Sequence, residues 1–178
     1  MKYFSVFLLI TAFLTGCKTS SQKPDTKQVL QEVNQTKSEF CLISDDHIYE
    51  LNDEMLFANI KPMKVESGAG DGFKWEIYTY PNVEIKVLIS DDNKKFYNKI
   101  TTTSSDYHTP RGIKVGDNFE KLSEAYKEEF DLYGSTEDSE GVEIYVYDPE
   151  HDVGFNKIFF YIENNVINKI ILENGIDG

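Results

Sequence analysis

Along most of the chain after residue 40, apolar and polar residues alternate with the period of two that is typical of β-strands. The alternation predicts six strands in two groups of three. The first group covers 74–80, 83–90 and 95–103, and the second group covers 142–147, 156–163 and 166–173. Asn, Asp and Pro residues separate the strands, and these residues favour the tight turns of antiparallel hairpins. The pattern therefore predicts two antiparallel meanders.

Each group of strands follows a segment with helical spacing. Before the second group, Asp117 is a suitable N-cap for a helix with one apolar stripe. The stripe consists of Phe119, Leu122, Tyr126 and Phe130. Before the first group the helical segment is shorter, from Asn52 to about Ala58, and Pro62 ends it.

Two short motifs occur twice in the chain. Glu76-Ile-Tyr-Thr-Tyr80 recurs as Glu143-Ile-Tyr-Val-Tyr147, and Asn98-Lys-Ile100 recurs as Asn168-Lys-Ile170. We expect an internal duplication with repeats at about 46–105 and 110–174, although two Tyr- and Ile-rich strands could also converge on such motifs. The predicted fold is α+β: two tandem helix-plus-three-strand antiparallel repeats that form one sheet with the helices on one face.

The alternation also assigns side chains to the two faces of the sheet. One face is mostly aliphatic, with Trp75, Ile77, Ile85, Ile144 and Phe160 among its members, and the helices would cover it. The other face carries Lys86, Leu88, Lys99, Phe159, Lys169 and most of the strand tyrosines. The candidate binding residues are Tyr78, Tyr80, Tyr97, Tyr145, Tyr147 and Tyr161. Tyrosine suits protein recognition because it combines a large, stiff contact area with a polar tip. Alternatively, the tyrosines line a solvated sheet, or residues 29–45 cover them.

The N-terminus has the features of an export signal. Lys2 precedes an apolar run from Tyr3 to Phe13, which is too short to span a bilayer as an anchor. Leu14-Thr15-Gly16-Cys17 follows and resembles the lipobox of bacterial lipoproteins. The resemblance implies cleavage before Cys17 and lipidation of its thiol, with a signal peptide over 1–16. An ordinary signal peptide with a chance cysteine is the alternative. Residues 17–38 would form the lipidated tether and residues 39–178 the α+β domain.

The net charge of −13 restricts the partners of this chain. Such a charge repels nucleic acid and anionic headgroups, so the lipid alone would hold the protein at the membrane. The expected location is extracytoplasmic. By resemblance to lipoprotein sorting rules, Lys18 directly after Cys17 implies the outer membrane if the cell has two membranes.

Two further residues stand out by their rarity. Cys41 is the second cysteine of the chain, and its surroundings favour a small buried residue on a strand. Arg111 is the only arginine beside 17 lysines, which suggests a need for its planar, bidentate head group. It is expected either to fix the link between the repeats by a salt bridge or to clamp an anion.

We find no sequence motif for catalysis, for a cofactor or for a metal. No Gly-x-Ser-x-Gly turn, calcium loop or phosphate-binding glycine loop is present, and the histidines show no zinc spacing. The sequence favours a non-catalytic binding or scaffolding protein of the envelope that recognises a protein partner through the sheet. A hydrolase of cell-wall or carbohydrate substrates that uses loop carboxylates is the alternative, as is a small-ligand carrier.

The layout of about residues 46–173 resembles that of two groups of exported bacterial proteins with helix-plus-sheet repeats. These are the β-lactamase inhibitor protein and the small outer-membrane assembly lipoproteins. Thr109-Pro-Arg-Gly-Ile-Lys-Val-Gly-Asp117, followed by a helix and aromatic strands, also looks like a unit of other bacterial lipoproteins. None of the inhibitor's contact residues can be matched here, so the resemblance implies a layout and no site.

Overall fold

The computed structural model describes residues 38–55, 61–70, 73–127, 130–135, 141–149 and 156–175. Cys17, the signal peptide over 1–16 and almost all of the predicted tether lie outside these ranges. Within them the chain is mostly β, with one α-helix, α2 (Phe119–Tyr126).

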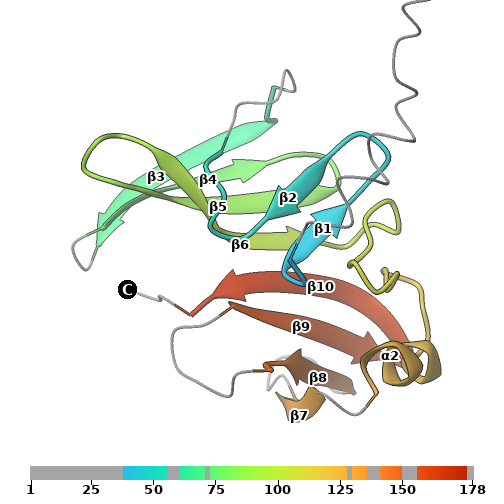
Figure 1. The fold of residues 1–178 in the computed structure, drawn as a ribbon. Helices are drawn as coiled ribbons and strands as arrows, with labels where there is room; N and C mark the ends of the chain where they lie inside the picture. Colours follow the sequence, from blue (N-terminus) through green and yellow to red (C-terminus); the bar gives the residue numbers. More distant parts are fainter. Residues whose placement is uncertain are drawn as a thin grey trace, which may run out of the picture.

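Eight antiparallel strands form one sheet in the order β3-β4-β5-β6-β10-β9-β8-β7 (Figure 1). The first four are β3 (Lys64–Gly70), β4 (Phe73–Thr79), β5 (Val83–Ile89) and β6 (Lys95–Thr102). The last four are β7 (Phe130–Ser135), β8 (Val142–Tyr147), β9 (Asn156–Glu163) and β10 (Val166–Asn174). A separate hairpin of β1 (Cys41–Ile43) and β2 (Ile48–Glu50) precedes them. The six predicted strands are confirmed to within a residue or two as β4, β5, β6, β8, β9 and β10.

The sheet consists of two meanders joined through their last strands. We call β3–β6 the first half sheet and β7–β10 the second half sheet. The pairing of β6 with β10 is symmetric, because Ile100 faces Leu172 while Ile170, its counterpart in the repeated motif, faces Thr102. The pairing register shifts at Asn98 and again at Asn168, so both copies of the Asn-Lys-Ile motif begin at a β-bulge. The repeated motifs therefore occupy equivalent places, while their origin by duplication stays a prediction.

The predicted α+β class and the helix-plus-three-strand unit are wrong. Each half sheet has four strands, and the β1–β2 hairpin rather than a helix packs beside the first half sheet. The start of the expected first helix is a turn, in which Asn52 has a φ of 66° and Glu54 bridges Phe96. Residues 56–58 of that predicted helix lie outside the described residues.

The two strands of the eight-stranded sheet that the sequence did not predict, β3 and β7, have local causes. In β3 the alternation is weak, because small residues fill its second half. Strand β7 was missed because the predicted apolar stripe of the helix extended to Phe130. The helix instead starts after the N-cap Asn118, one residue later than predicted, and ends at Lys127, whose φ of 46° is left-handed. Phe130 therefore begins β7 rather than the last turn of a helix.

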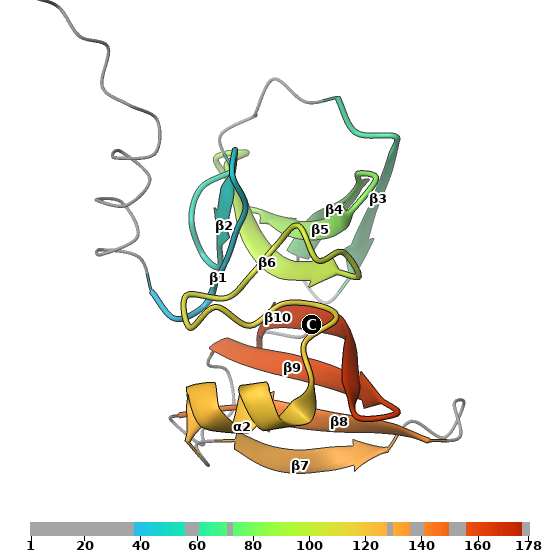
Figure 2. The same ribbon diagram turned by 90° about the vertical axis from the view of Figure 1, so that its right-hand side faces the viewer.

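The β1–β2 hairpin and α2 lie against the same face of the sheet, beside the first and the second half respectively (Figure 2). From the hairpin, the Tyr49 ring meets the Tyr97 ring edge-on at 5.9 Å. From the helix, Tyr126 meets Phe160 at 5.3 Å. We call this the covered face, and the hydrophobic core lies between it and these two elements. The opposite side of the sheet is called the open face, since none of the described helices or strands packs on it.

Candidate functional site

Most of the predicted tyrosine platform lies on the covered face. Tyr78 pairs with Ile85, and Tyr145 pairs with Phe160, so each tyrosine shares a face with the core residue opposite it. Tyr78, Tyr97 and Tyr147 retain 5%, 8% and 4% of their exposure. Tyr80 and Tyr145 are half-buried and pack against the same core, and Tyr161 points to the open face. The prediction of one exposed tyrosine surface is therefore wrong.

The segment before β3 covers part of this tyrosine cluster, as one of the alternatives expected. Phe40 lies 6.0 Å from Tyr147 between ring centroids, and Tyr49 of β2 contacts Tyr97. Burial raises the pKa of Tyr97 to about 12, with smaller contributions from Tyr80 and Asp53. These phenols stay neutral at physiological pH and act as core side chains.

Arg111 makes three directed contacts from one guanidinium, and one of them is the salt bridge that one of its two predicted roles requires. Its Nε donates to Glu39 at 2.9 Å, and its two terminal nitrogens donate to the Ala125 carbonyl at 3.3 Å and to the Tyr147 hydroxyl at 3.0 Å. The head group also lies 4.5 Å from the ring centre of Tyr126. Arg111 thus ties the segment before β1 to the end of α2 and to β8.

Cys41 is fully buried on β1, as predicted, and its Sγ donates to the Ser38 carbonyl at 3.3 Å. Within the described ranges, no group of three or more His, Cys, Asp and Glu side chains is placed to hold a metal ion.

The open face of the first half sheet is the surface left available for recognition. Trp75, Leu88 and Phe96 follow one another across β4, β5 and β6 as directly opposite, half-buried side chains. The Trp75 ring lies flat over Gly68 of β3, where a Cβ atom would approach the ring to 2.3 Å. The absence of a side chain at position 68 therefore leaves the space that the indole occupies at the edge of the sheet. We call Trp75, Leu88 and Phe96 the apolar shelf.

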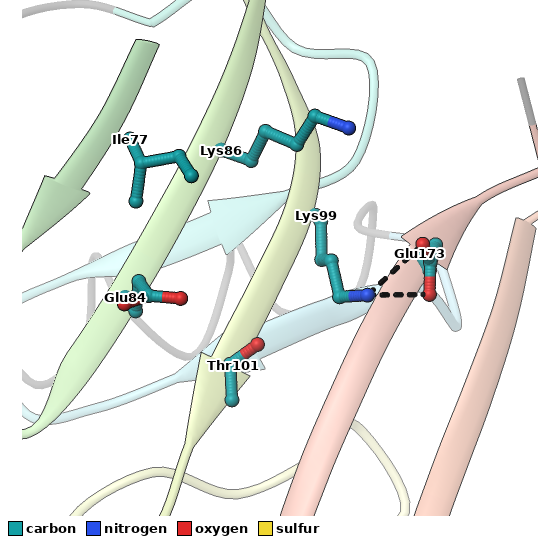
Figure 3. Close-up of a pocket in the computed structure, with 6 residues that line it drawn as sticks. All are labelled: Ile77, Glu84, Lys86, Lys99, Thr101 and Glu173. Carbon is teal, nitrogen blue, oxygen red and sulfur yellow. Dashed lines mark hydrogen bonds and ion pairs between the residues drawn. The ribbon is translucent and has the colours of Figure 1, made fainter. Parts of the chain in front are cut away.

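A charged row runs across the strands beside the apolar shelf. Its members pair in register from β4 to β9: Ile77, Lys86, Lys99, Glu173 and Lys157. Part of this row lines a shallow hollow of about 360 Å³, together with Glu84 and Thr101 (Figure 3). The hollow thus combines aliphatic and charged groups.

The lysines of this row near β9 form ion pairs, whereas the lysine on β5 does not. Lys99 reaches both carboxylate oxygens of Glu173 at 3.0 Å, and Lys157 lies 2.8 Å from Asp148. The Lys86 side chain makes no hydrogen bond or ion pair with any described residue, and its only charged neighbour in register is another cation, Lys99. Figure 3 shows the Lys86 amine well apart from the Glu84 carboxylate on the other side of the hollow.

The second half sheet has a different pair at the corresponding positions. Pairing through the repeated strands makes Tyr161 the counterpart of Lys86 and Lys169 the counterpart of Lys99. The Lys169 amine lies 3.6 Å above the Tyr161 ring. Burial lowers the pKa of Lys169, and the nearby charge of Lys99 lowers it further. This half therefore places a π face beside its cation, where the first half places a second cation.

A separate polar cluster on the covered face bears on the hydrolase alternative. Lys95 Nζ lies 2.6 Å from both the Glu76 carboxylate and the Tyr78 hydroxyl, and Tyr78 also bonds Glu76. Burial alone would raise the pKa of Glu76, but the hydrogen bonds from Lys95 and Tyr78 lower it. Glu76 is thus held ionised, which is the opposite of what a general acid needs.

Sequence reasoning placed Lys86, Lys99 and Leu88 on the face away from the core, and the pairing registers confirm this. It missed Trp75 and Ile77, which it assigned to the core face. The signal that could have found them is the strand Trp75-Glu-Ile-Tyr-Thr-Tyr80, in which each alternating set contains two large aromatic or aliphatic residues. Such a strand can be placed with either set inward, so only the pairing with β5 decides.

Within the described ranges no helix has the length and apolarity to cross a membrane. The predicted lipid anchor at Cys17 and the resemblance to exported repeat proteins stay predictions. No family model, curated protein or solved structure matches this chain.

Proposed function

We propose that this protein is a lipid-anchored envelope protein that binds a protein partner through the open face of its sheet, in a non-catalytic or scaffolding role. The observation that carries this proposal is the difference between the two faces. The hairpin and α2 cover one face, whereas Trp75, Leu88 and Phe96 remain only half-buried on the open face of the first half sheet.

The composition of the open face supports recognition of a protein. Trp75, Phe96, Phe159 and Tyr161 contribute aromatic area, and lysines are interspersed among them. Aromatic residues are enriched at the centres of protein interfaces, where they supply most of the binding energy. An open sheet face with rigid strands also keeps these side chains in place before binding, which lowers the entropic cost of association.

The anchor follows from the lipobox and from the charge. A net charge of −13 opposes binding to anionic headgroups, so acyl chains on Cys17 would supply the membrane affinity. Cys17→Ser is expected to abolish incorporation of an alkyne-labelled fatty acid and to release the protein from the membrane fraction. Unchanged labelling of the variant would contradict the anchor without affecting the docking proposal.

Site-specific photocrosslinking in the producing cells tests the docking face. A photoreactive amino acid at Leu88 lies on the apolar shelf, and the same group at Lys74 lies on the other face of the same half sheet. We expect one discrete crosslinked product from position 88 and none from position 74. Products of equal yield from both positions, or none from position 88, would contradict docking through the open face.

A further inference from the structure

The charged row on the open face ends in a cation without a counterion among the described residues. From β9 to β5 the row reads Lys157, Glu173, Lys99 and Lys86. Asp148 and Glu173 accompany the first two lysines, at 2.8 and 3.0 Å. One more carboxylate beside Lys86 would complete the alternation of charges.

The Lys86–Lys99 pair costs stability in the free protein. Like charges directly opposite each other on neighbouring antiparallel strands are destabilising. Lys169 adds a third positive charge to this region. Burial lowers the pKa of the Lys169 amine, and the charge of Lys99 lowers it further. A cationic cluster of this kind stands out in a chain with 31 acidic and 18 basic residues.

The second half sheet shows that the scaffold does not require this cost. Tyr161 occupies the position of Lys86 there, and its ring accepts the Lys169 amine at 3.6 Å. The same backbone arrangement therefore accommodates two side chains that interact favourably with each other. The fold therefore does not require a lysine at position 86.

The apolar shelf lies in the next row of side chains. Trp75 and Leu88 are opposite each other, two residues along their strands from Ile77 and Lys86. A ligand that places a carboxylate at Lys86 therefore has an apolar contact one strand step away, at the spacing of alternate residues in an extended peptide.

We propose that Lys86 and Lys99 bind an aspartate or glutamate side chain of the docking partner, whose neighbouring apolar residue packs on Trp75 and Leu88. The inference rests on the proposed docking function and adds the chemistry of the partner. A single carboxylate contacts only the local lysines, because the field of distant charges is screened within about 8 Å at physiological salt. A long polyanion would instead meet the repulsion of the whole acidic protein.

The test uses Trp75 as its reporter, since it is the only tryptophan of the chain. The lipid-anchored protein, purified from membranes in detergent, is titrated with the blocked peptides Thr-Val-Asp-Val-Thr and Thr-Val-Asn-Val-Thr while Trp75 emission is followed. We expect the aspartate peptide to bind about tenfold more tightly, as a charge-assisted contact with lysine provides. Added salt should reduce this preference.

Two variants with the same loss of charge locate the effect. Lys86→Met should abolish the preference for aspartate, and Lys74→Met, on the other face, should retain it. Lys86→Met removes a like-charge contact, so urea unfolding should show it to be at least as stable as the parent. Lys86→Arg should retain the preference and so exclude a general effect of altering the strand.

Equal affinities for the two peptides, no response of Trp75 to either, or an unchanged preference in Lys86→Met would overturn the inference. The crosslinking experiment at Leu88 separates this failure from failure of the docking function. A crosslinked product without an aspartate preference would support docking through the open face and contradict recognition of a carboxylate. The absence of both the product and the preference would contradict both proposals.

Discussion

Lys86 in the first half sheet and Tyr161 in the second occupy corresponding positions, each opposite a lysine of the Asn-Lys-Ile motif. Around them the backbone is nearly the same, with four antiparallel strands and a bulge at the motif's asparagine. In the second half the pair is internally satisfied by a cation–π contact. In the first half two cations face each other beside an apolar shelf. Equivalent backbones thus carry different surface chemistry, and the difference marks the half where we expect a partner.

The elements that cover the two halves differ as well. A helix of eight residues covers the second half, and one hairpin of two three-residue strands covers the first. Arg111 lies between these elements, with Glu39 on one side and Ala125 and Tyr147 on the other. Arg111 therefore joins the segment before the hairpin to the helix and to β8.

Replacing that arginine should give the largest effect. Arg111→Lys retains the charge but loses the planar fork that reaches three partners and stacks on Tyr126. We expect the free energy of unfolding to fall by about 1–3 kcal/mol, since each hydrogen bond to a charged group contributes on that order. Urea denaturation measures the change.

The outcome also distinguishes the structural role of Arg111 from the anion clamp that the sequence left open. Crosslinking from Leu88 should be unaffected under conditions where Arg111→Lys remains folded. Unchanged stability together with a lost crosslink would favour the clamp instead. Lys114→Met, an exposed substitution in the same loop, serves as the control for the loop itself.

The buried faces of β5 and β9 could be predicted from the sequence, whereas those of β4 and β8 could not. In β5 and β9 the exposed set contains two charged residues, so the buried set is evident. In β4 and β8 the charged residues Lys74, Glu76 and Glu143 share a face with the buried tyrosines, and the assumption that isoleucine turns inward reversed Tyr78 and Tyr145. A one-residue shift in such a strand exchanges its faces at little cost in local pattern.

Tyr97 shows a second limit of pattern reasoning. Simple alternation from Ile100 places residue 97 on the opposite face, but the bulge at Asn98 adds one residue and turns Tyr97 inward. The candidate site was missed for a related reason. The opposition of Lys86 and Lys99, and the seat of Trp75 on Gly68, depend on cross-strand register. The sequence contains that register only through turns and bulges.

Exchanging residue 86 between the two chemistries should have a moderate effect of opposite sign on stability and binding. Lys86→Tyr recreates the Tyr161–Lys169 pair in the first half, removes the like-charge contact and adds a π face near Lys99. We expect a gain of about 0.5–1 kcal/mol in unfolding free energy. The preference for the aspartate peptide should disappear.

The reciprocal change, Tyr161→Lys, is the matched control. It should place a second cation beside Lys169 and lower the stability by a similar amount. A loss of stability in Lys86→Tyr, measured by urea denaturation, would mean that the two half sheets are not interchangeable at this position.

The acid limb of the stability curve gives the smallest expected effect, and it again compares the halves. Glu76 accepts hydrogen bonds from Tyr78 and Lys95, whereas its counterpart Glu143 accepts a bond only from Tyr145 among these groups. Asn165 stands where the first half has Lys95.

Although burial would raise it, the pKa of Glu76 is lowered from 4.5 by the hydrogen bonds from Lys95 and Tyr78. A carboxyl with a lowered pKa stabilises the fold above its unfolded pKa and loses that contribution as the pH falls through the folded value. Glu76→Gln should therefore cost about 0.5 kcal/mol at pH 7 and progressively less below pH 4.5. Urea denaturation at a series of pH values measures this, with Glu143→Gln as the matched carboxyl loss. A cost of Glu76→Gln that stays constant from pH 7 to pH 3 would show that Lys95 does not hold this carboxylate ionised in the folded protein.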